Sequence, residues 1–330
     1  MTPTLLKNGI MKAFVLRQNG GVENLVVSEL PMPQIGRHEV LIRTRAFSVN
    51  RVDAFVRQND FAVNVFYKPE AGEESIVLGW DVSGIVDAVG DNVKDFEVGD
   101  EVFGLVNFFG RGRANAEYVA APAAHLAIKP SVVSHEAAAA SGLTALTAWE
   151  AIITYGQVAA GQIVLIQGAG GGVGHFAVQL AKHQGAHVIG TGSPQSRDFI
   201  LGLGADEFID YTTGPVDHAV SDVDVVVDPM PGPHVLHSLN AARRGGRVIN
   251  LLPYDDHDGR MAATIKDKRL FRHRVIVSSN GSTVKKIASL LEAGTLKPHL
   301  SKVFSFEQLP LAHTAIESGR TKGKIVVVVP

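Results

Sequence analysis

A glycine-rich stretch near the middle of the chain has the residue types and spacing of a phosphate-binding turn. The apolar run 162–167 breaks into glycines, and apolar residues then recur at helical spacing over 173–184. The stretch reads Ala169-x-Gly171-x-x-Gly174, a variant of G-x-G-x-x-G with alanine first. Glycines let the backbone approach a pyrophosphate, and the helix N-terminus meets its charge. We expect the dinucleotide to contact Ala169, Gly170, Gly171, Gly172 and Val173. The alternative is a tightly packed glycine turn that binds nothing.

The residue that follows the second strand bears on which dinucleotide fits. Proteins that prefer NAD place Asp or Glu about 20 residues past the glycines, where the carboxylate binds the ribose hydroxyls. Here the strand 187–191 is followed by Gly192, which leaves room for a 2′-phosphate. Ser193 and Ser196 offer hydroxyls, and Arg197 offers a permanently charged guanidinium. We therefore expect NADPH rather than NADH. The alternative for Arg197 is an ordinary solvated helix residue.

Cysteine is absent, which removes disulfides, a thiolate nucleophile and every zinc site built on Cys. The 13 His residues are scattered, with no close ligand spacing such as H-x-x-x-H on an expected helix. We therefore expect no catalytic metal. Hydride transfer from a nicotinamide to a small-molecule electron acceptor remains, with the protein supplying orientation and a dry pocket.

Length and charge narrow the class of protein. A chain of 330 residues fits two domains of ordinary size, and its net charge of -2 implies no nucleic-acid or anionic-membrane partner. The segment 1–11 lacks the apolar core of a signal peptide, and no run approaches the roughly 18 apolar residues of a membrane span. We expect a soluble, cytoplasmic enzyme.

The elements that must position these groups fall into two classes. Short strands separated by turns predict a mostly β domain over residues 11–126. Beyond Lys129-Pro130, Ser134 is a helix cap, a helix is expected over 144–155, and strands alternate with helices up to residue 278. This alternation predicts an α/β fold with a doubly wound parallel sheet. The tail, with a closing strand over 325–329, is expected to pack on the first domain.

Several separated motifs together resemble the medium-chain dehydrogenase/reductase superfamily, and within it the zinc-free quinone oxidoreductases to which zeta-crystallin belongs. The motifs are Ser48-Val49-Asn50-Arg51-Val52-Asp53, Leu78-Gly79-Trp80-Asp81-Val82-Ser83-Gly84-Ile85-Val86, Val98-Gly99-Asp100-Glu101-Val102, Ala116-Glu117-Tyr118-Val119, Gly142-Leu143-Thr144-Ala145-Leu146-Thr147-Ala148-Trp149, the turn 168–174, Leu203-Gly204-Ala205-Asp206, Gly245-Gly246-Arg247-Val248 and Gly323-Lys324-Ile325-Val326. Each is common alone, but their order is specific and covers nearly the whole chain.

The resemblance implies a GroES-like catalytic domain from residues 1–130 and 279–330, with a Rossmann NADPH-binding domain over 131–278. Zinc alcohol dehydrogenases of the superfamily carry metal ligands that this chain lacks. Val49-Asn50 stands where the first Cys would lie, and Gly79-Trp80-Asp81 stands in place of Gly-His-Glu. The resemblance therefore implies zinc-free chemistry.

The resemblance also assigns residues to the site. Asn50 and Asp53 are expected near the nicotinamide ribose and the active cleft, and Thr147 near the nicotinamide. For Asn50-x-x-Asp53 the alternative is a helix N-cap, and nothing in the sequence indicates a raised pKa for Asp53. The further residues implied for cofactor binding are Tyr211, Leu251, Leu252, Val277 and Arg320.

Family members often have Arg-x-Gly-x-Tyr after this motif, where this chain has Arg57-Gln58-Asn59-Asp60-Phe61. Because Phe61 replaces a phenol, we expect solvent or a ribose hydroxyl to supply the proton. Phe61, Tyr67, Trp80 and Phe108-Phe109 are candidate walls of an apolar pocket for a flat substrate, with core packing as the alternative.

Three functions follow from this pattern. The first is an NADPH-dependent reductase of quinones or α,β-unsaturated carbonyls, two substrate classes that accept hydride at a conjugated carbon. The second is an NADPH-binding structural or regulatory protein of the zeta-crystallin type, and the third is an alcohol dehydrogenase. The apolar strand 274–278, expected at a sheet edge, predicts a homodimer by pairing across a two-fold axis.

Overall fold

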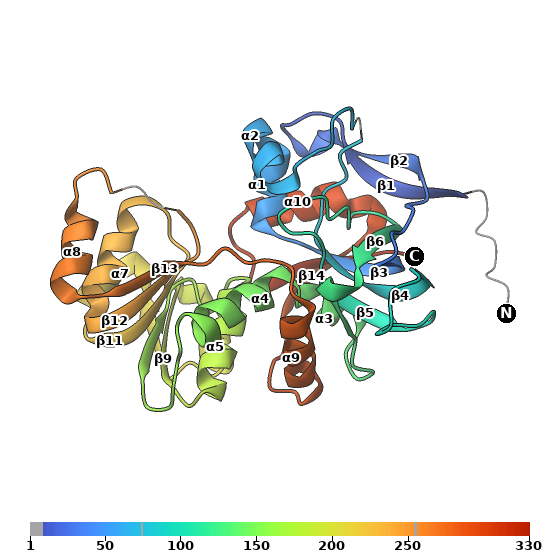
Figure 1. Cartoon of the computed structure of the whole chain (residues 1–330). Coiled ribbons are helices and arrows are strands. Elements are labelled where there is room, and N and C mark those ends of the chain that lie inside the picture. Colours follow the sequence, from blue (N-terminus) through green and yellow to red (C-terminus); the bar gives the residue numbers. More distant parts are fainter. Residues whose placement is uncertain (1–8, 74, 254–255) are drawn as a thin grey trace. The chain divides into compact units, whose positions relative to one another are not determined.

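The structure is a computed structural model that describes residues 9–73, 75–253 and 256–330. The chain divides into two compact units. The first contains the described residues up to Leu143, together with Ser278–Ala293 and Leu300–Pro330. The second contains Thr144–Val277 and Gly294–His299. The sequence predicts the boundary between the two domains at Lys129-Pro130, which is earlier in the chain than the division after Leu143. Figure 1 shows the elements coloured along the sequence.

The first unit is built on a seven-stranded sheet in the order β14-β15-β3-β4-β5-β7, with β6 also paired to β3. The pairs are antiparallel except for β14 with β15. The strands are β3 Glu39–Val49, β4 Asp81–Val89, β5 Glu101–Leu105, β6 Tyr118–Pro122, β7 Leu126–Ile128, β14 Leu300–Ser305 and β15 Lys324–Val328. A separate hairpin pairs β1 Ile10–Leu16 with β2 Leu25–Pro31.

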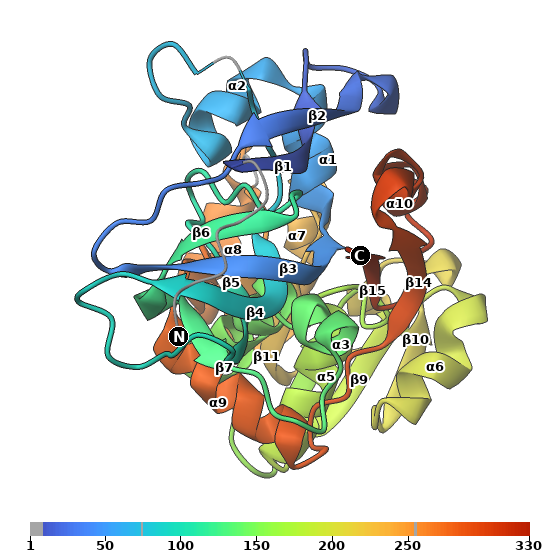
Figure 2. The ribbon, with the colours of Figure 1, turned by 90° about the vertical axis from the view of Figure 1, so that its right-hand side faces the viewer.

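The tail of the chain packs as the sequence predicts. Strand β15 pairs with β3 in the register Ile325↔Val49, so the last strand completes the sheet of the first unit (Figure 2). This pairing joins a segment near the C-terminus to residues that lie more than 270 positions earlier in the chain. Val40, Ile42, Val82 and Val102 of the strands of this sheet belong to one buried hydrophobic cluster.

The first unit also contains several helices. They are α1 Arg51–Gln58, α2 Asp60–Ala62 with the π-helical turn Val63–Tyr67, α3 His135–Ala140, α9 Gly281–Glu292 and α10 Leu309–Glu317. Ser134 caps α3 as predicted, because its hydroxyl accepts a hydrogen bond from the Ala137 N–H at 3.2 Å. Helix α1 follows β3 directly and was not expected from the sequence beyond its possible N-cap.

The second unit is a doubly wound parallel sheet of the Rossmann type, as predicted. Its order is β10-β9-β8-β11-β12-β13, and every neighbouring pair is parallel. The strands are β8 Ile163–Ile166, β9 His187–Gly192, β10 Glu207–Asp210, β11 Val223–Asp228, β12 Ala242–Asn250 and β13 Phe271–Arg274. Its helices are α4, which starts at Leu143 and ends at Trp149, α5 Gly174–His183, α6 Arg197–Gly202, α7 Val235–Ala241 and α8 Arg260–Lys268.

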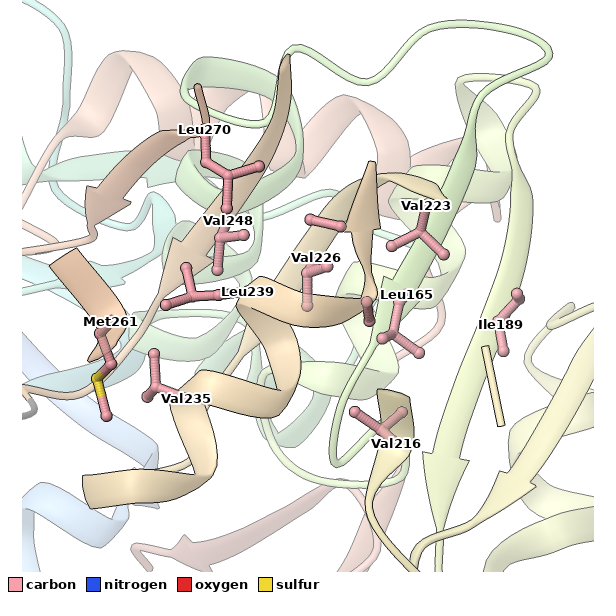
Figure 3. Packing of buried hydrophobic residues seen from close by; sticks show 12 residues of the cluster. Leu165, Ile189, Val216, Val223, Val226, Val235, Leu239, Val248, Met261 and Leu270 are labelled. Atoms are coloured by element: carbon pink, nitrogen blue, oxygen red, sulfur yellow. The ribbon is translucent and has the colours of Figure 1, made fainter. Parts of the chain in front are cut away.

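The direction of winding reverses between β8 and β11, the point at which ligands bind in such sheets. Val235 and Leu239 of α7 pack with Met261 of α8 against Val226 and Val248 of the strands (Figure 3). These buried aliphatic residues hold the strands in register, so the positions of the loops at their carboxyl ends are set by a packed core.

Two expected elements differ from the structure. The strand expected over 273–278 runs from Phe271 to Arg274, and only the Val275 N–H, which donates to the Asn250 carbonyl at 2.9 Å, continues the pairing beyond it. The edge position is correct, since β13 is the last strand of its sheet. The helix expected over 144–155 ends at Trp149 and continues as the π-helical turn Glu150–Thr154, a local widening that apolar spacing does not reveal.

Candidate active site and cofactor-binding residues

The glycine turn joins β8 to α5 in the second unit, in the arrangement expected of a phosphate-binding turn. Gly168 has φ +60°, and a Cβ on Gly174 would lie 2.3 Å from the Gly168 carbonyl oxygen. A side chain at position 174 would therefore push the turn apart, so the backbone needs glycine there. Gly171 donates its N–H to the Gly168 carbonyl at 2.9 Å, which closes the turn.

The predicted contact residues of this turn have different exposures. Ala169 is buried and donates its N–H to the Thr191 carbonyl at 2.9 Å, whereas the residues 170–173 are half-buried. The N–H groups of His175, Phe176 and Ala177 donate to the carbonyls of Gly171 and Val173 at 3.0–3.2 Å, and the positive end of the α5 dipole lies beside these half-buried residues. His175 is buried, with Nδ1 3.0 Å from the Gly171 carbonyl oxygen, so it packs in the turn and does not face a ligand. A cradle of this shape fits the pyrophosphate of a nicotinamide dinucleotide.

Strand β9 ends beside the turn at Gly192. A Cβ there would lie 2.4 Å from Ser196 Oγ and 2.5 Å from Ile200 Cδ1, so a side chain at this position would require these two side chains to move. Ser193 is half-buried, and Ser196 is buried and donates its hydroxyl to the Ser193 carbonyl at 2.7 Å. Arg197 is exposed, with its guanidinium carbon 5.5 Å from the centre of the Phe208 ring.

The other cofactor residues implied by the resemblance are spread over both units. Tyr211 follows β10 and is 57% exposed. Leu251 donates its N–H to the Asp228 carbonyl at 2.8 Å, Leu252 is exposed and Val277 is buried. The remaining two are Thr147, which is buried in α4, and Arg320, which is exposed in the first unit.

Sequence reasoning missed two polar residues at the carboxyl edge of the parallel sheet. Asp228 and Asn250 end β11 and β12, stand opposite each other in the register and are fully buried. Burial raises the pKa of Asp228 to about 6, although the Met230 N–H donates to its Oδ1 at 2.7 Å. The signal available in the sequence was a polar residue at the end of each apolar run.

In the first unit, Asn50 and Asp53 belong to a buried polar cluster whose other members are Ser48, Asp81 and Lys324. None of the five is more than 4% exposed. Asn50 donates from Nδ2 to Asp81 Oδ2 at 2.8 Å, and Ser48 donates its hydroxyl to the same oxygen at 2.5 Å. Lys324 donates from Nζ to Asn50 Oδ1 and lies 3.8 Å from Asp81 Oδ2. Strands β3, β4 and β15 position these groups, because they are neighbours in one sheet.

Asp53 also serves the start of α1. Its Oδ2 accepts the Asn50 backbone N–H at 2.6 Å, so the alternative interpretation of Asn50-x-x-Asp53 as a helix cap is correct for Asp53. Asn50 and Asp53 form a capping box at the start of α1, and the Asn50 side chain also joins Asp81 to Lys324.

The expectation of an ordinary pKa for Asp53 is wrong. Burial raises this pKa to about 7, and the nearby Asp81 carboxylate adds to the increase, against the backbone hydrogen bond from Asn50 and the charge of Lys324. Burial likewise lowers the pKa of Lys324, against the attraction of Asp81 and Asp53. The roles of Asp81 and Lys324 were missed, although both stand in motifs quoted above. The signal for Lys324 was a lysine at the start of an apolar strand.

The three aromatic residues predicted to line a pocket lie in different environments. Phe61 is 60% exposed, whereas Tyr67 and Trp80 are fully buried. Tyr67 donates its hydroxyl to Glu73 Oε1 at 2.7 Å, and burial raises its pKa to about 12. Trp80 donates from Nε1 to the Gly110 carbonyl at 2.6 Å. A groove of the first unit is lined in part by Phe108 and Phe109, and the three predicted residues are not among its walls.

Two searches of the described residues bear on metal and membrane. In the ranges 9–73, 75–253 and 256–330, no group of three or more His, Asp or Glu residues is placed to hold a metal ion. Within the same ranges, no helix has the length and apolar character that crossing a membrane requires.

Comparisons with known proteins agree with the two units. Residues 36–131 match the family model described as "Alcohol dehydrogenase GroES-like domain", and residues 203–327 match "Zinc-binding dehydrogenase". The chain is 32% identical to mouse "NAD(P)H oxidoreductase RTN4IP1, mitochondrial", over 99% of this chain and 91% of the relative. It is also 32% identical to the Arabidopsis thaliana "NADPH-dependent alkenal/one oxidoreductase, chloroplastic", over 96% of this chain and 79% of the relative.

A solved structure shares the whole fold. The quinone oxidoreductase from Coxiella burnetii superposes with a TM-score of 0.88 at 28% identity, and the match covers 97% of this chain and 100% of that one. The glycine turn on a parallel sheet, the GroES-like β unit completed by the chain's own tail, and relatives similar over nearly their full length together identify the chain as a member of the medium-chain dehydrogenase/reductase superfamily of oxidoreductases.

Proposed function

We propose that this chain is a zinc-independent, NADPH-dependent reductase of quinones or α,β-unsaturated carbonyls. The observation that carries the proposal is the glycine turn Gly168–Gly174 beside a strand that ends in Gly192. The turn suits the pyrophosphate of a dinucleotide, and glycine at position 192 provides no carboxylate that would bind the 2′-hydroxyl of NADH. The printed names of the relatives, which include an NADPH-dependent alkenal/one oxidoreductase and a quinone oxidoreductase, support the acceptor classes.

Each part of the chain has a task in this reaction. The glycine turn and the positive end of the α5 dipole bind the pyrophosphate, and Ser193, Arg197 and Tyr211 hold the adenosine end with its 2′-phosphate. When bound, NADPH supplies a hydride to the acceptor. Leu251, Leu252 and Val277 shape the nicotinamide side of the sheet edge, together with Thr147. Arg320 is assigned to the 2′-phosphate or the adenine. Asn50 and Asp53 are assigned to the reacting side, and exposed Phe61 to the acceptor pocket, whereas Tyr67 and Trp80 are fully buried and fit the alternative of core packing.

The buried cluster of the first unit supports zinc-free chemistry. Val49-Asn50 stands where zinc alcohol dehydrogenases hold a Cys ligand, and the Asn50 amide oxygen accepts from the ammonium group of Lys324. The indole of Trp80, which stands at a His ligand position, is a donor that can bind no metal. A cation and two nitrogen donors therefore occupy the places where a zinc ion would need electron pairs.

The proposal extends to assembly and organisation. We assign residues 1–130 and 279–330 to the GroES-like catalytic domain and 131–278 to the NADPH-binding domain, and we propose a cytoplasmic location. A homodimer would pair the edge strand β13 across a two-fold axis, and exposed Phe271 and Ile276 at this edge support that contact. Sedimentation velocity of wild type and Ile276→Glu tests the dimer, which the charge should weaken.

The test of function is the oxidation of NADPH, followed by loss of its near-ultraviolet absorbance, against benzoquinone, naphthoquinone, an enone and a simple aldehyde. NADH and a chelator are parallel arms. Chelator-insensitive reaction with a quinone or enone, with NADPH preferred, is expected. Reaction with the aldehyde alone, abolished by chelator, would show an alcohol dehydrogenase. NADPH binding without turnover of any acceptor would show the structural or regulatory protein.

A further inference from the structure

The guanidinium of Arg197 is held against an aromatic ring. Its carbon lies over the Phe208 ring, 5.5 Å from the ring centre, which is within the distance at which a cation is attracted to the face of a ring. Arg197 is the first residue of α6 and Phe208 lies in β10, so the contact joins a helix to a strand of the same unit. Without such a contact, an exposed arginine would sample many side-chain conformations.

The Phe208 ring borders the end of β9. Strands β9 and β10 are paired in parallel, with Phe208 opposite Gly190 and Asp210 opposite Gly192. A Cβ at Gly192 would lie 3.3 Å from Phe208 Cε2, so the edge of the ring reaches the last residue of β9. The adenosine ribose of a bound dinucleotide lies beyond the end of this strand in sheets of this type. The ring therefore holds Arg197 next to the place that a 2′-phosphate would take.

The helix that carries Arg197 also borders the glycine turn. A Cβ at Gly170 would lie 3.6 Å from Ser196 Cβ and 3.6 Å from Ile200 Cγ1. Ser196 directly precedes α6, and Ile200 belongs to it. The turn assigned to the pyrophosphate and the arginine assigned to the 2′-phosphate are thus joined through one short helix, which fixes the Arg197 backbone relative to the turn.

The hydrogen-bond donors of Arg197 are free to bind a ligand. Among the residues that the structure describes, its guanidinium has no carboxylate partner and no hydrogen-bond acceptor, and the Phe208 ring is its one partner. The ring attracts the positive charge and takes no conventional hydrogen bond, so the N–H groups in the guanidinium plane stay available. A planar fork of this kind matches the oxygens of a phosphate, which it binds through two parallel hydrogen bonds.

We propose that Phe208 is a positioning residue for cofactor specificity, whose ring holds the Arg197 guanidinium beside Gly192 for the 2′-phosphate of NADPH. This inference rests on the proposed function, because it names the residue that prepares the 2′-phosphate site. A long side chain that is ordered only when the ligand binds costs affinity, and a ring that orders it beforehand removes part of that cost. NADH lacks the 2′-phosphate, so loss of the ring should weaken the binding of NADPH and leave that of NADH unchanged.

The test compares substitutions at Phe208 with a control at a second arginine–phenylalanine pair. Phe208→Leu removes the ring, Phe208→Tyr keeps it, and Phe208→Met is a second variant without the ring in case the leucine variant does not fold. Phe271→Leu is the matched control, because the guanidinium carbon of Arg247 lies 4.7 Å from the centre of the Phe271 ring in the same unit, on β13. The probes are adenosine 2′,5′-bisphosphate and AMP, which differ by the 2′-phosphate alone.

Calorimetric titration of the full chain with the two nucleotides is the first readout. We expect Phe208→Leu to raise the Kd of the bisphosphate about two- to fivefold, the range for a cation–ring contact at an exposed site, with the Kd of AMP unchanged. Phe208→Tyr and Phe271→Leu should bind both nucleotides as wild type does. In steady-state kinetics the KM for NADPH should rise by a similar factor at unchanged kcat. Equal changes for both nucleotides, or no change in a folded variant without the ring, would overturn the inference.

A double-mutant cycle separates positioning from a general structural role. If the ring acts through Arg197, Phe208→Leu should weaken bisphosphate binding no further once Arg197→Gln is present. Losses that add up in the double variant would contradict this. A wild type that binds the bisphosphate and AMP equally well would overturn the inference, because no 2′-phosphate site would then exist. A wild type that prefers the bisphosphate but reduces no acceptor would contradict the proposed reductase function and leave the role of Phe208 to the binding results.

Discussion

Replacement of Asp53 by asparagine should stabilise the protein, and more strongly at high pH. Asp53 is 1% exposed, and burial raises its pKa from the usual 3.8 to about 7. The folded protein therefore holds a proton between these pH values that the unfolded chain has released. Stability contributed by this proton is present at low pH and is lost progressively as the pH rises from about 4 to about 7. Asparagine has the shape of the protonated acid and keeps an oxygen that can accept the Asn50 N–H.

The magnitude follows from the two pKa values. They differ by about 3, and one pKa unit corresponds to about 1.36 kcal/mol, so ionised Asp53 costs the folded state about 4 kcal/mol above pH 7. The gain in free energy of unfolding for Asp53→Asn should be close to zero near pH 4. It should then rise by about 1.4 kcal/mol for each pH unit and level off above pH 7.

Urea unfolding of wild type and Asp53→Asn at intervals from pH 5 to pH 8 measures this difference. Asp91→Asn is the control, because Asp91 is exposed and the same change of charge should alter stability by less than about 0.5 kcal/mol at every pH. A difference for Asp53→Asn that does not vary with pH would refute the reasoning. A loss of stability that grows with pH would show that Lys324 holds Asp53 ionised in the folded protein.

Three further predictions concern the cofactor site and a buried histidine. Gly192→Ala should lower the free energy of unfolding by about 1–3 kcal/mol and weaken NADPH binding, because the added methyl group would lie 2.4 Å from Ser196 Oγ. Urea unfolding and NADPH titration measure the two effects. Gly202→Ala is the control and should show neither effect, because its methyl group would meet no atom within 4 Å. Arg197→Gln should raise the KM for NADPH several-fold and leave that for NADH unchanged in parallel assays, whereas equal changes would remove Arg197 from the 2′-phosphate site. Burial lowers the pKa of His313 to about 3, so below pH 6.5 the unfolded chain gains a proton that the folded chain cannot bind. His313→Leu should therefore gain stability over wild type as the pH falls from 7 to 5. A difference in free energy of unfolding between the two proteins that stays constant with pH would contradict this.

The local features of the Rossmann unit could be read from the sequence. The run 162–167, the glycines and the apolar spacing over 173–184 predicted β8, the turn and α5, because each depends on residues close together in the chain. The pairing of the tail with the first unit was also predictable, since a lone helix and strand cannot bury their own apolar faces. The bounds of β13, Phe271–Arg274, were not, because they depend on its pairing with β12, which comes from another part of the chain.

The residue types at the candidate site were visible in the sequence, but their chemistry was not. The sequence by itself determined that no thiolate is present, that a glycine turn follows β8 and that glycine stands at the end of β9. Only the tertiary structure brought Lys324 to Asn50, two residues 274 positions apart, and buried Asp53 beside Asp81. A pKa and the orientation of an amide depend on desolvation and on charges from distant strands, and these exist only once the sheet has formed.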